Sequence, residues 1–152
     1  MSTEESRPWN VADRLHSAAI HLLRRLRIQD LASGVGPAKL SALSVLVFSS
    51  HPLSLAELAQ AEQVKNPTMS RLVSDMQRDG LVQIAESKRD ARSIQITPTA
   101  RGRELLLAGK KRRVDSLANA IESLNAAELG RLEDGVELVR QIIQRLSSSP
   151  SC

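Results

Sequence analysis

The feature that most constrains this chain is a pair of helix-start signals separated by a very short connection. Ser54 and Glu57 have the spacing of a capping box, so a helix is predicted to begin directly after Ser54. A second helix is predicted to begin at Pro67, with Asn66 as its N-cap and Gly80 at the left-handed position past its end. Two short helices joined by about four residues predict a helix-turn-helix, whose second helix enters a DNA groove.

The second helix is predicted to be amphipathic. Its inward residues recur at helical spacing: Met69, Leu72, Val73 and Met76. The outward residues near its N-terminus are the candidate DNA contacts: Pro67, Thr68, Ser70, Arg71 and Ser74. A helix N-terminus attracts phosphate, and an arginine can donate two hydrogen bonds to one guanine edge. The alternative interpretation is an ordinary surface helix in which Arg71 and Asp75 form an ion pair at i, i+4.

Two strand-like segments follow this helix, and a charged tip separates them. Residues 81–85 and 93–97 alternate in polarity, which predicts a β-hairpin. The tip carries three cationic residues: Lys88, Arg89 and Arg92. A charged tip alone often serves only solubility, but next to a helix-turn-helix it predicts the wing of a winged helix, whose cations reach phosphate or a minor groove. Asp90 is expected to form a salt bridge with Arg92 that shapes the tip.

Three segments in this order resemble the multiple-antibiotic-resistance regulator (MarR) family. They are NPTMSRLVSDMQRDGLV at 66–82, DAR at 90–92 and TARGREL at 99–105. The resemblance implies a dimeric winged-helix transcription regulator, and many such regulators release DNA when a small, often aromatic, acid binds. It also implies that Asp90 and Arg92 stabilise and position the wing. Pro98 stands where the family usually has an aliphatic residue, which leaves the end of the second wing strand open.

Longer helices are predicted on both sides of this core, at 11–31, 100–124 and 126–146, with apolar residues spaced three and four apart. One copy of the chain cannot easily cover such stripes, so a two-fold dimer through the terminal helices is expected. The predicted fold class is mainly α with a small β-hairpin wing (α+β). The predicted organisation is a flexible N-terminus 1–10, an N-terminal dimerisation helix 11–36, a winged helix-turn-helix core 37–99, C-terminal dimerisation helices 100–146 and a disordered tail 147–152.

An effector site is implied by the resemblance alone. Family pockets lie between the dimer helices and the DNA-binding lobe, which points to four candidate residues: Leu22, Arg25, Leu43 and Leu46. An acidic or phenolic small molecule is the expected ligand. The scarcity of aromatic residues weighs against stacking of a phenolic ring, so a regulator without any ligand remains an alternative.

Composition limits the possible partners. The net charge is +4, which agrees with a polyanionic partner. The chain has one Trp, one Phe and no Tyr, so the base stacking used by single-strand binders is not expected, and duplex DNA is favoured. The basic block Lys110–Arg113 circles its helix, so it is expected to be mainly solvated surface, with one or two side chains near the DNA backbone.

Other classes of site find no support in the pattern. The three histidines have no ligand-spaced Cys or carboxylate partners, so no metal and no cofactor is expected. The only cysteine, Cys152, has no second cysteine for an internal disulfide. No phosphate-binding loop or nucleophile motif is present, so no enzymatic activity is expected. No apolar run approaches the ~18 residues that cross a bilayer, and the polar N-terminus is no secretory signal, which favours the cytoplasm.

Together these features predict a homodimeric, sequence-specific regulator of transcription that binds double-stranded DNA at a pseudo-palindromic operator. A repressor that a small organic acid releases is the expected form. The alternative is a winged-helix module that docks a protein instead of DNA.

Overall fold

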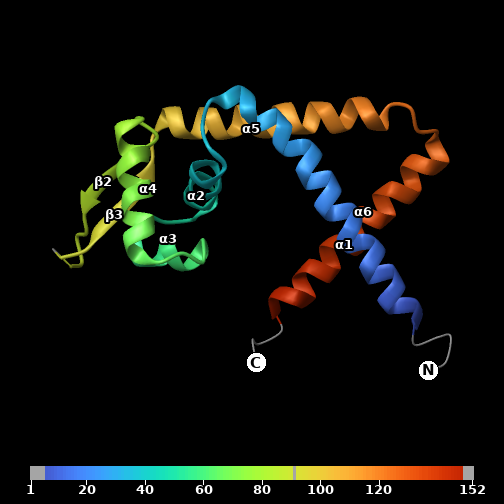
Figure 1. Cartoon of the computed structure of the whole chain (residues 1–152), viewed down its shortest axis with the longest axis horizontal. Helices are drawn as coiled ribbons and strands as arrows, with labels where there is room; N and C mark the ends of the chain where they lie inside the picture. Colours follow the sequence, from blue (N-terminus) through green and yellow to red (C-terminus); the bar gives the residue numbers. More distant parts are fainter. Residues whose placement is uncertain (1–5, 91, 149–152) are drawn as a thin grey trace. The chain divides into compact units, whose positions relative to one another are not determined.

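The computed structural model describes residues 6–90 and 92–148, which are mainly helical with one small antiparallel sheet, as the sequence predicts (Figure 1). The described elements are α1 (Ser6–Arg27), the 3-10 helix η1 (Ile28–Ser33), α2 (Pro37–Phe48), β1 (Leu53–Ser54), α3 (Leu55–Ala61), α4 (Asn66–Arg78), β2 (Val82–Glu86), β3 (Ile94–Pro98), α5 (Ala100–Ile121) and α6 (Ala126–Ser148). The chain divides into two compact units, and the boundary falls within α5 between Arg113 and Val114.

The first unit contains a winged-helix lobe built from α2, α3, α4, the sheet and the start of α5. The strand order is β1-β3-β2, with both pairs antiparallel. The core of the lobe is aliphatic and contains Leu43, Leu46, Leu53, Leu58, Met69, Val73, Met76, Leu81, Val82, Ile96 and Leu106. Of the stripe predicted for α4, Met69, Val73 and Met76 are buried in this core and Leu72 is half-buried.

The wing strands each lie one residue later than the predicted segments. Val82 pairs with Pro98, and Ile84 pairs with Ile96, so the second strand runs through Pro98. A proline is tolerated at the end of a strand, where a missing N–H interrupts little of the ladder. The first strand is only the pair Leu53–Ser54, and it joins the sheet through Ile96.

The N-terminal boundary differs from the prediction. α1 begins at Ser6, so residues 6–10 of the segment predicted to be flexible belong to this helix. Pro8 lies in the first turn of α1, where its missing N–H removes no helical hydrogen bond. η1 ends at Ser33 and is followed by Gly34, whose φ of 68° is left-handed. Residues 1–5 of the predicted flexible segment lie outside the described part of the chain.

The second unit consists of the end of α5 and of α6. Asn125 caps α6, because its Oδ1 accepts from the Glu128 amide at 2.9 Å while Glu128 accepts from the Asn125 amide at 3.0 Å. α6 continues to Ser148, so it includes the first two residues of the tail predicted at 147–152. The rest of that tail, including Cys152, lies outside the described residues.

Within residues 6–90 and 92–148, no single helix is long and apolar enough to span a membrane. By length and composition alone, the segments Ser6–Ser33 and Pro37–Phe48 together would be long and apolar enough, but the chain bends by 93° between them.

Candidate nucleic-acid interface

α4 turns a polar face to solvent. Its residues Met69, Val73 and Met76 are buried against the lobe, which fixes the rotation of the helix about its axis. All five predicted contact residues are exposed on the opposite side: Pro67, Thr68, Ser70, Arg71 and Ser74. The hydrophobic stripe thus brings together one guanidinium and several small polar side chains near the helix N-terminus.

The N-terminus of α4 has no side-chain cap. Asn66 is the first helical residue and not the N-cap, and Lys65 occupies the cap position without a side-chain hydrogen bond. Proline fits either of the first two helical positions, so the sequence could not fix the start to one residue. The N-termini of α3, α5 and α6 are capped by Ser54, Thr99 and Asn125. In contrast, α4 keeps amide donors of its first turn available for an anion.

The ion pair on α4 is not the one that the surface-helix interpretation requires. Asp75 pairs with Arg78 at 3.2 Å, and within the described residues Arg71 makes no ion pair. The Ser74 hydroxyl donates to the Ser70 carbonyl at 2.9 Å, so its proton is already used within the helix. Arg71 is therefore the one guanidinium on this face whose donors are available to a partner.

The wing tip is shaped by backbone hydrogen bonds. The carboxylate of Asp90 accepts from the backbone amide of Arg92 at 3.0 Å, so the predicted side-chain salt bridge is replaced by an Asx-type turn. The short side chain of Asp90 reaches the Arg92 amide directly, whereas the long Arg92 side chain would have to fold back to meet the carboxylate. Lys88 and Arg92 remain exposed, and Ala91 between Asp90 and Arg92 lies outside the described residues.

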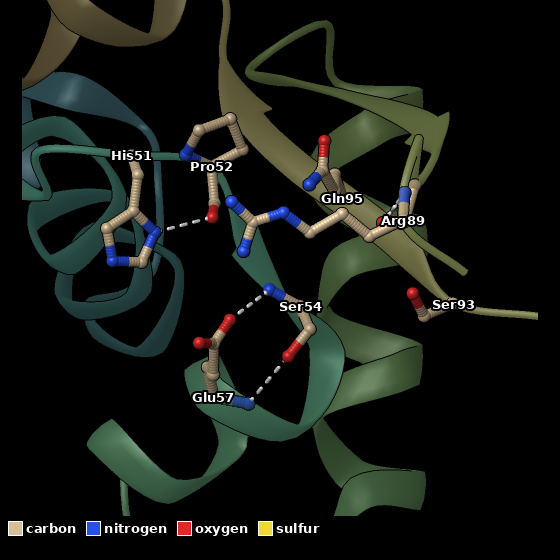
Figure 2. Close-up of a pocket in the computed structure, with 8 residues that line it drawn as sticks. His51, Pro52, Ser54, Glu57, Arg89, Ser93 and Gln95 are labelled. Carbon is tan, nitrogen blue, oxygen red and sulfur yellow. Dashed lines mark hydrogen bonds between the residues drawn. The ribbon is translucent and has the colours of Figure 1, made fainter. Parts of the chain in front are cut away.

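Arg89 extends away from the tip toward the helix-turn-helix. Arg89 lines an open cavity of about 750 Å³. Figure 2 shows its guanidinium directed toward the Pro52 carbonyl and the start of α3. Across the cavity, Glu57 accepts from the Ser54 amide at 2.7 Å while Ser54 Oγ accepts from the Glu57 amide at 3.2 Å, which confirms the capping box. The hydrogen bond from the Ser54 amide, with a smaller contribution from the Ser54 side chain, holds the pKa of the Glu57 carboxyl below its ordinary value.

Two polar links attach the helix-turn-helix to α2. The Lys39 ammonium donates to Asp79 at 2.7 Å, at the end of α4, and this bond lowers the pKa of the Asp79 carboxyl. The Ser41 hydroxyl donates to Glu62 at 3.0 Å, at the end of α3. Neither pair could be predicted from the sequence, because no local pattern connects residues so far apart in the chain.

The basic block in α5 contacts protein. Arg113 forms an ion pair with Asp30, and Arg112 Nε donates to the Gln29 carbonyl at 3.4 Å. Lys110 Nζ lies 6.0 Å from the ring centre of Phe48. Arg112 and Arg113 are half-buried and bind the segment before α2, whereas Lys110 and Lys111 are exposed, so the prediction of a mainly solvated block holds for the two lysines and not for the two arginines.

A cavity of about 280 Å³ lies among α1, η1, α2 and α5, the zone predicted for an effector. Its lining includes Leu23, Arg27, Asp30, Leu40, Leu106 and Arg113. The four predicted residues do not line it: Leu43 and Leu46 are in the core, and Leu22 and Arg25 are exposed on α1. One residue rotates a side chain by about 100° around a helix, so an error of one or two positions selects the wrong face.

Among the described residues, no group of three or more His, Cys, Asp or Glu side chains could hold a metal ion.

Comparisons with known proteins agree with this geometry. A MarR family model matches residues 33–93, which span the helix-turn-helix and the wing tip. An uncharacterised HTH-type transcriptional regulator of Mycobacterium bovis is 29% identical over 133 residues, which cover 88% of this chain and 92% of that relative. A similar regulator of Mycobacterium leprae is 27% identical over 133 residues, with the same coverage.

Solved structures share the fold over nearly the whole chain. A MarR family protein from Bacillus stearothermophilus has a TM-score of 0.78 at 22% identity, over 94% of this chain and 99% of that chain. A transcriptional regulator from Thermotoga maritima has a TM-score of 0.79 at 19% identity, over 93% of this chain and 99% of that chain. At these identities the likeness establishes the winged-helix fold.

Proposed function

We propose that this chain is a winged-helix transcriptional regulator of the MarR family and that it works as a homodimer on a pseudo-palindromic duplex operator. The observation that carries the proposal is the first turn of α4, which is uncapped, exposed and next to the unpaired Arg71. An uncapped helix N-terminus supplies amide donors to a phosphate, and it carries the positive end of the helix dipole. Binding requires no chemistry on the DNA, so no catalytic role is proposed.

Each residue of the interface has a distinct role in this proposal. Arg71 reads a base edge, with Thr68 and Ser70 as hydrogen-bonding neighbours. Pro67 supplies apolar contact, and Ser74 offers its oxygen as an acceptor, since its proton is used within the helix. The wing cations provide attraction that is independent of sequence: Lys88, Arg89 and Arg92. Asp90 maintains the turn that presents them.

Dimerisation supplies the second reading helix. The terminal helices leave large apolar side chains exposed, including Trp9, Val11, Leu129, Leu132, Val136, Ile143 and Leu146. A two-fold interface would cover such stripes and would place two copies of α4 for successive major grooves, about 34 Å apart. We propose that the dimer acts in the cytoplasm as a repressor.

The cavity of about 280 Å³ is the proposed effector site. Leu23, Leu40 and Leu106 offer an apolar wall, and Arg27 offers charge to a small organic acid, since Arg113 is already paired with Asp30. Calorimetry with salicylate-like acids tests this step. Heat of binding that Arg27→Ala abolishes supports it, and no binding at millimolar acid would favour a regulator without a ligand.

Selection of bound fragments from random duplex DNA tests the main proposal. Recovered fragments should share a motif with two inverted half-sites, and a fluorescent duplex carrying that motif should resist bulk competitor at moderate salt. No enrichment, or a protein that stays monomeric at micromolar concentration, would overturn it. Failure to discriminate any duplex would favour the alternative of a protein-docking winged helix.

A further inference from the structure

The turn that follows α4 is joined to the start of α5 by hydrogen bonds and by one close approach of the two backbones. α4 ends in a Schellman motif: Gly80 is left-handed with φ 72°, its amide donates to Gln77, and the Leu81 amide donates to the Met76 carbonyl at 2.9 Å. Leu81 is fully buried immediately after this turn. The path of the chain leaving the reading helix is thus determined by hydrogen bonds at each residue.

Thr99 connects this turn to α5. Its hydroxyl donates to the Gly80 carbonyl at 2.6 Å and accepts from the Gly102 amide at 3.0 Å. Its own amide donates to the Leu81 carbonyl at 3.0 Å. One residue therefore caps α5 and binds Gly80 and Leu81 in the turn after α4, so this turn and the start of α5 cannot move apart without breaking these bonds.

Gly102 allows the backbones to touch. A Cβ added at Gly102 would lie 2.2 Å from the Leu81 carbonyl oxygen and 3.1 Å from Leu43 Cδ1. Gly102 is buried, and its backbone is helical with no left-handed φ, so conformational freedom does not explain a glycine here. A glycine inside a helix costs about 1 kcal/mol relative to alanine, and the close approach to Leu81 gives a reason for that cost.

We propose that Thr99 and Gly102 are positioning residues that hold α4 and the first turns of α5 as one rigid body. The inference rests on the proposed DNA-binding function and extends it. α5 is held near its start by Thr99 and Gly102, and again at Arg113 by the ion pair with Asp30. These two attachments fix the direction of the first half of the helix. In a dimer formed through the terminal helices, this joint then determines how the two reading helices meet successive half-sites.

An alanine at Gly102 should displace α5 from Leu81 by about 1 Å, because nonbonded carbon and oxygen atoms do not approach within 2.2 Å. That shift exceeds the range of about 0.5 Å over which a protein hydrogen bond is well formed. Base contacts should therefore suffer, while wing cations on flexible side chains should still reach phosphates.

The chain offers a matched control on the same helix. Gly109 is also buried, yet a Cβ there would meet its nearest neighbour, Arg112, at 3.6 Å, which is ordinary contact. Gly102→Ala and Gly109→Ala make the same chemical change, so only the first should alter DNA recognition. Thr99→Ala and Thr99→Ser form a second pair, since serine keeps the bridging hydroxyl.

The experiment uses the full-length protein, the selected operator, and duplexes whose half-site spacing is changed by one or two base pairs. Gly102→Ala should remain folded and dimeric, bind random duplex within about twofold of wild type, and lose roughly tenfold or more on the operator. Its preferred spacing should shift, while Gly109→Ala should match wild type. Thr99→Ala should lose affinity in the same direction, and Thr99→Ser should restore it.

Unchanged operator affinity and spacing in folded Gly102→Ala would overturn the proposal. If that variant does not fold, the threonine pair decides, and equal operator binding by Thr99→Ala and wild type would overturn it. Amide exchange separates this failure from failure of the proposed function, because it needs no DNA. Thr99→Ala should accelerate exchange at Gly102 and at Gly80 and Leu81 together, and acceleration at Gly102 alone would contradict a shared rigid body.

Discussion

The winged-helix lobe and the terminal helices differ in how their apolar residues are covered. In the lobe, Leu58, Met69 and Ile96 are fully buried by other elements of the same chain. α1 and α6 contain no buried residue, and exposure on α6 reaches 72% at Leu146. We infer that the stability of the lobe is a property of one chain, whereas the terminal helices depend on a partner.

The largest expected effect lies in the lobe core. Leu58→Ala should lower the free energy of unfolding by about 2–5 kcal/mol, because the removed side chain leaves a cavity in a packed interior. Urea titration followed by circular dichroism measures it. The loss should be the same at all protein concentrations, and a loss that disappears at high concentration would break the distinction between lobe and arms.

The matching change on α6 should act through association. Leu132 is 39% exposed in one chain, so Leu132→Ala should leave the lobe intact and weaken the dimer by about 1.5–3 kcal/mol, roughly tenfold or more in dissociation constant. Sedimentation across a concentration series measures this constant. Wild type should melt at higher temperature as its concentration rises. A concentration-independent melting temperature would indicate that one chain covers its own stripes.

Within the lobe, the reading helix should show a gradient from its N-terminus to its C-terminus. Arg71→Ala should cost about 1–3 kcal/mol on the selected operator, because a bidentate base contact is lost. Arg78→Ala is the control on the same helix, since Arg78 is paired with Asp75 near the other end. Fluorescence anisotropy measures both, and equal losses would remove Arg71 from base readout.

The wing should contribute affinity without sequence preference. Lys88→Ala should weaken all duplexes alike and reduce the slope of log affinity against log salt by about one, because one phosphate contact disappears. Titrations at several salt concentrations measure the slope on operator and random duplex. A loss confined to the operator would assign base reading to the wing.

The smallest expected effect is the pH dependence of the Lys39–Asp79 link. The hydrogen bond from Lys39 holds the pKa of Asp79 below its ordinary value of 3.8, so the link stabilises the folded lobe above that pH and its contribution is lost as the pH falls through the lower folded value. Asp79→Asn should be slightly less stable than wild type at pH 7, and the difference should vanish in acid. Urea titrations at both pH values measure it, and a difference that grows on acidification would contradict the assignment.

Sequence-based prediction succeeded where the cause is local. The capping box at Ser54, the buried stripe of α4 and the left-handed Gly80 each depend on residues within a few positions of one another. The start of α4 was misplaced by one residue because proline suits two adjacent positions. The wing turn lies where the sequence predicts it, but Asp90 binds the backbone amide of Arg92 and not its guanidinium.

By itself, the sequence therefore determined the order of the elements, the faces that they bury and the polar residues left on the reading helix. Only the tertiary structure decided that Arg113 meets Asp30, that Gly102 touches Leu81, and which side chains line the cavity beside α1. These contacts join residues that are distant in the chain, and they depend on helix rotation and separation. Packing of the whole lobe sets those two quantities, and no local spacing encodes them.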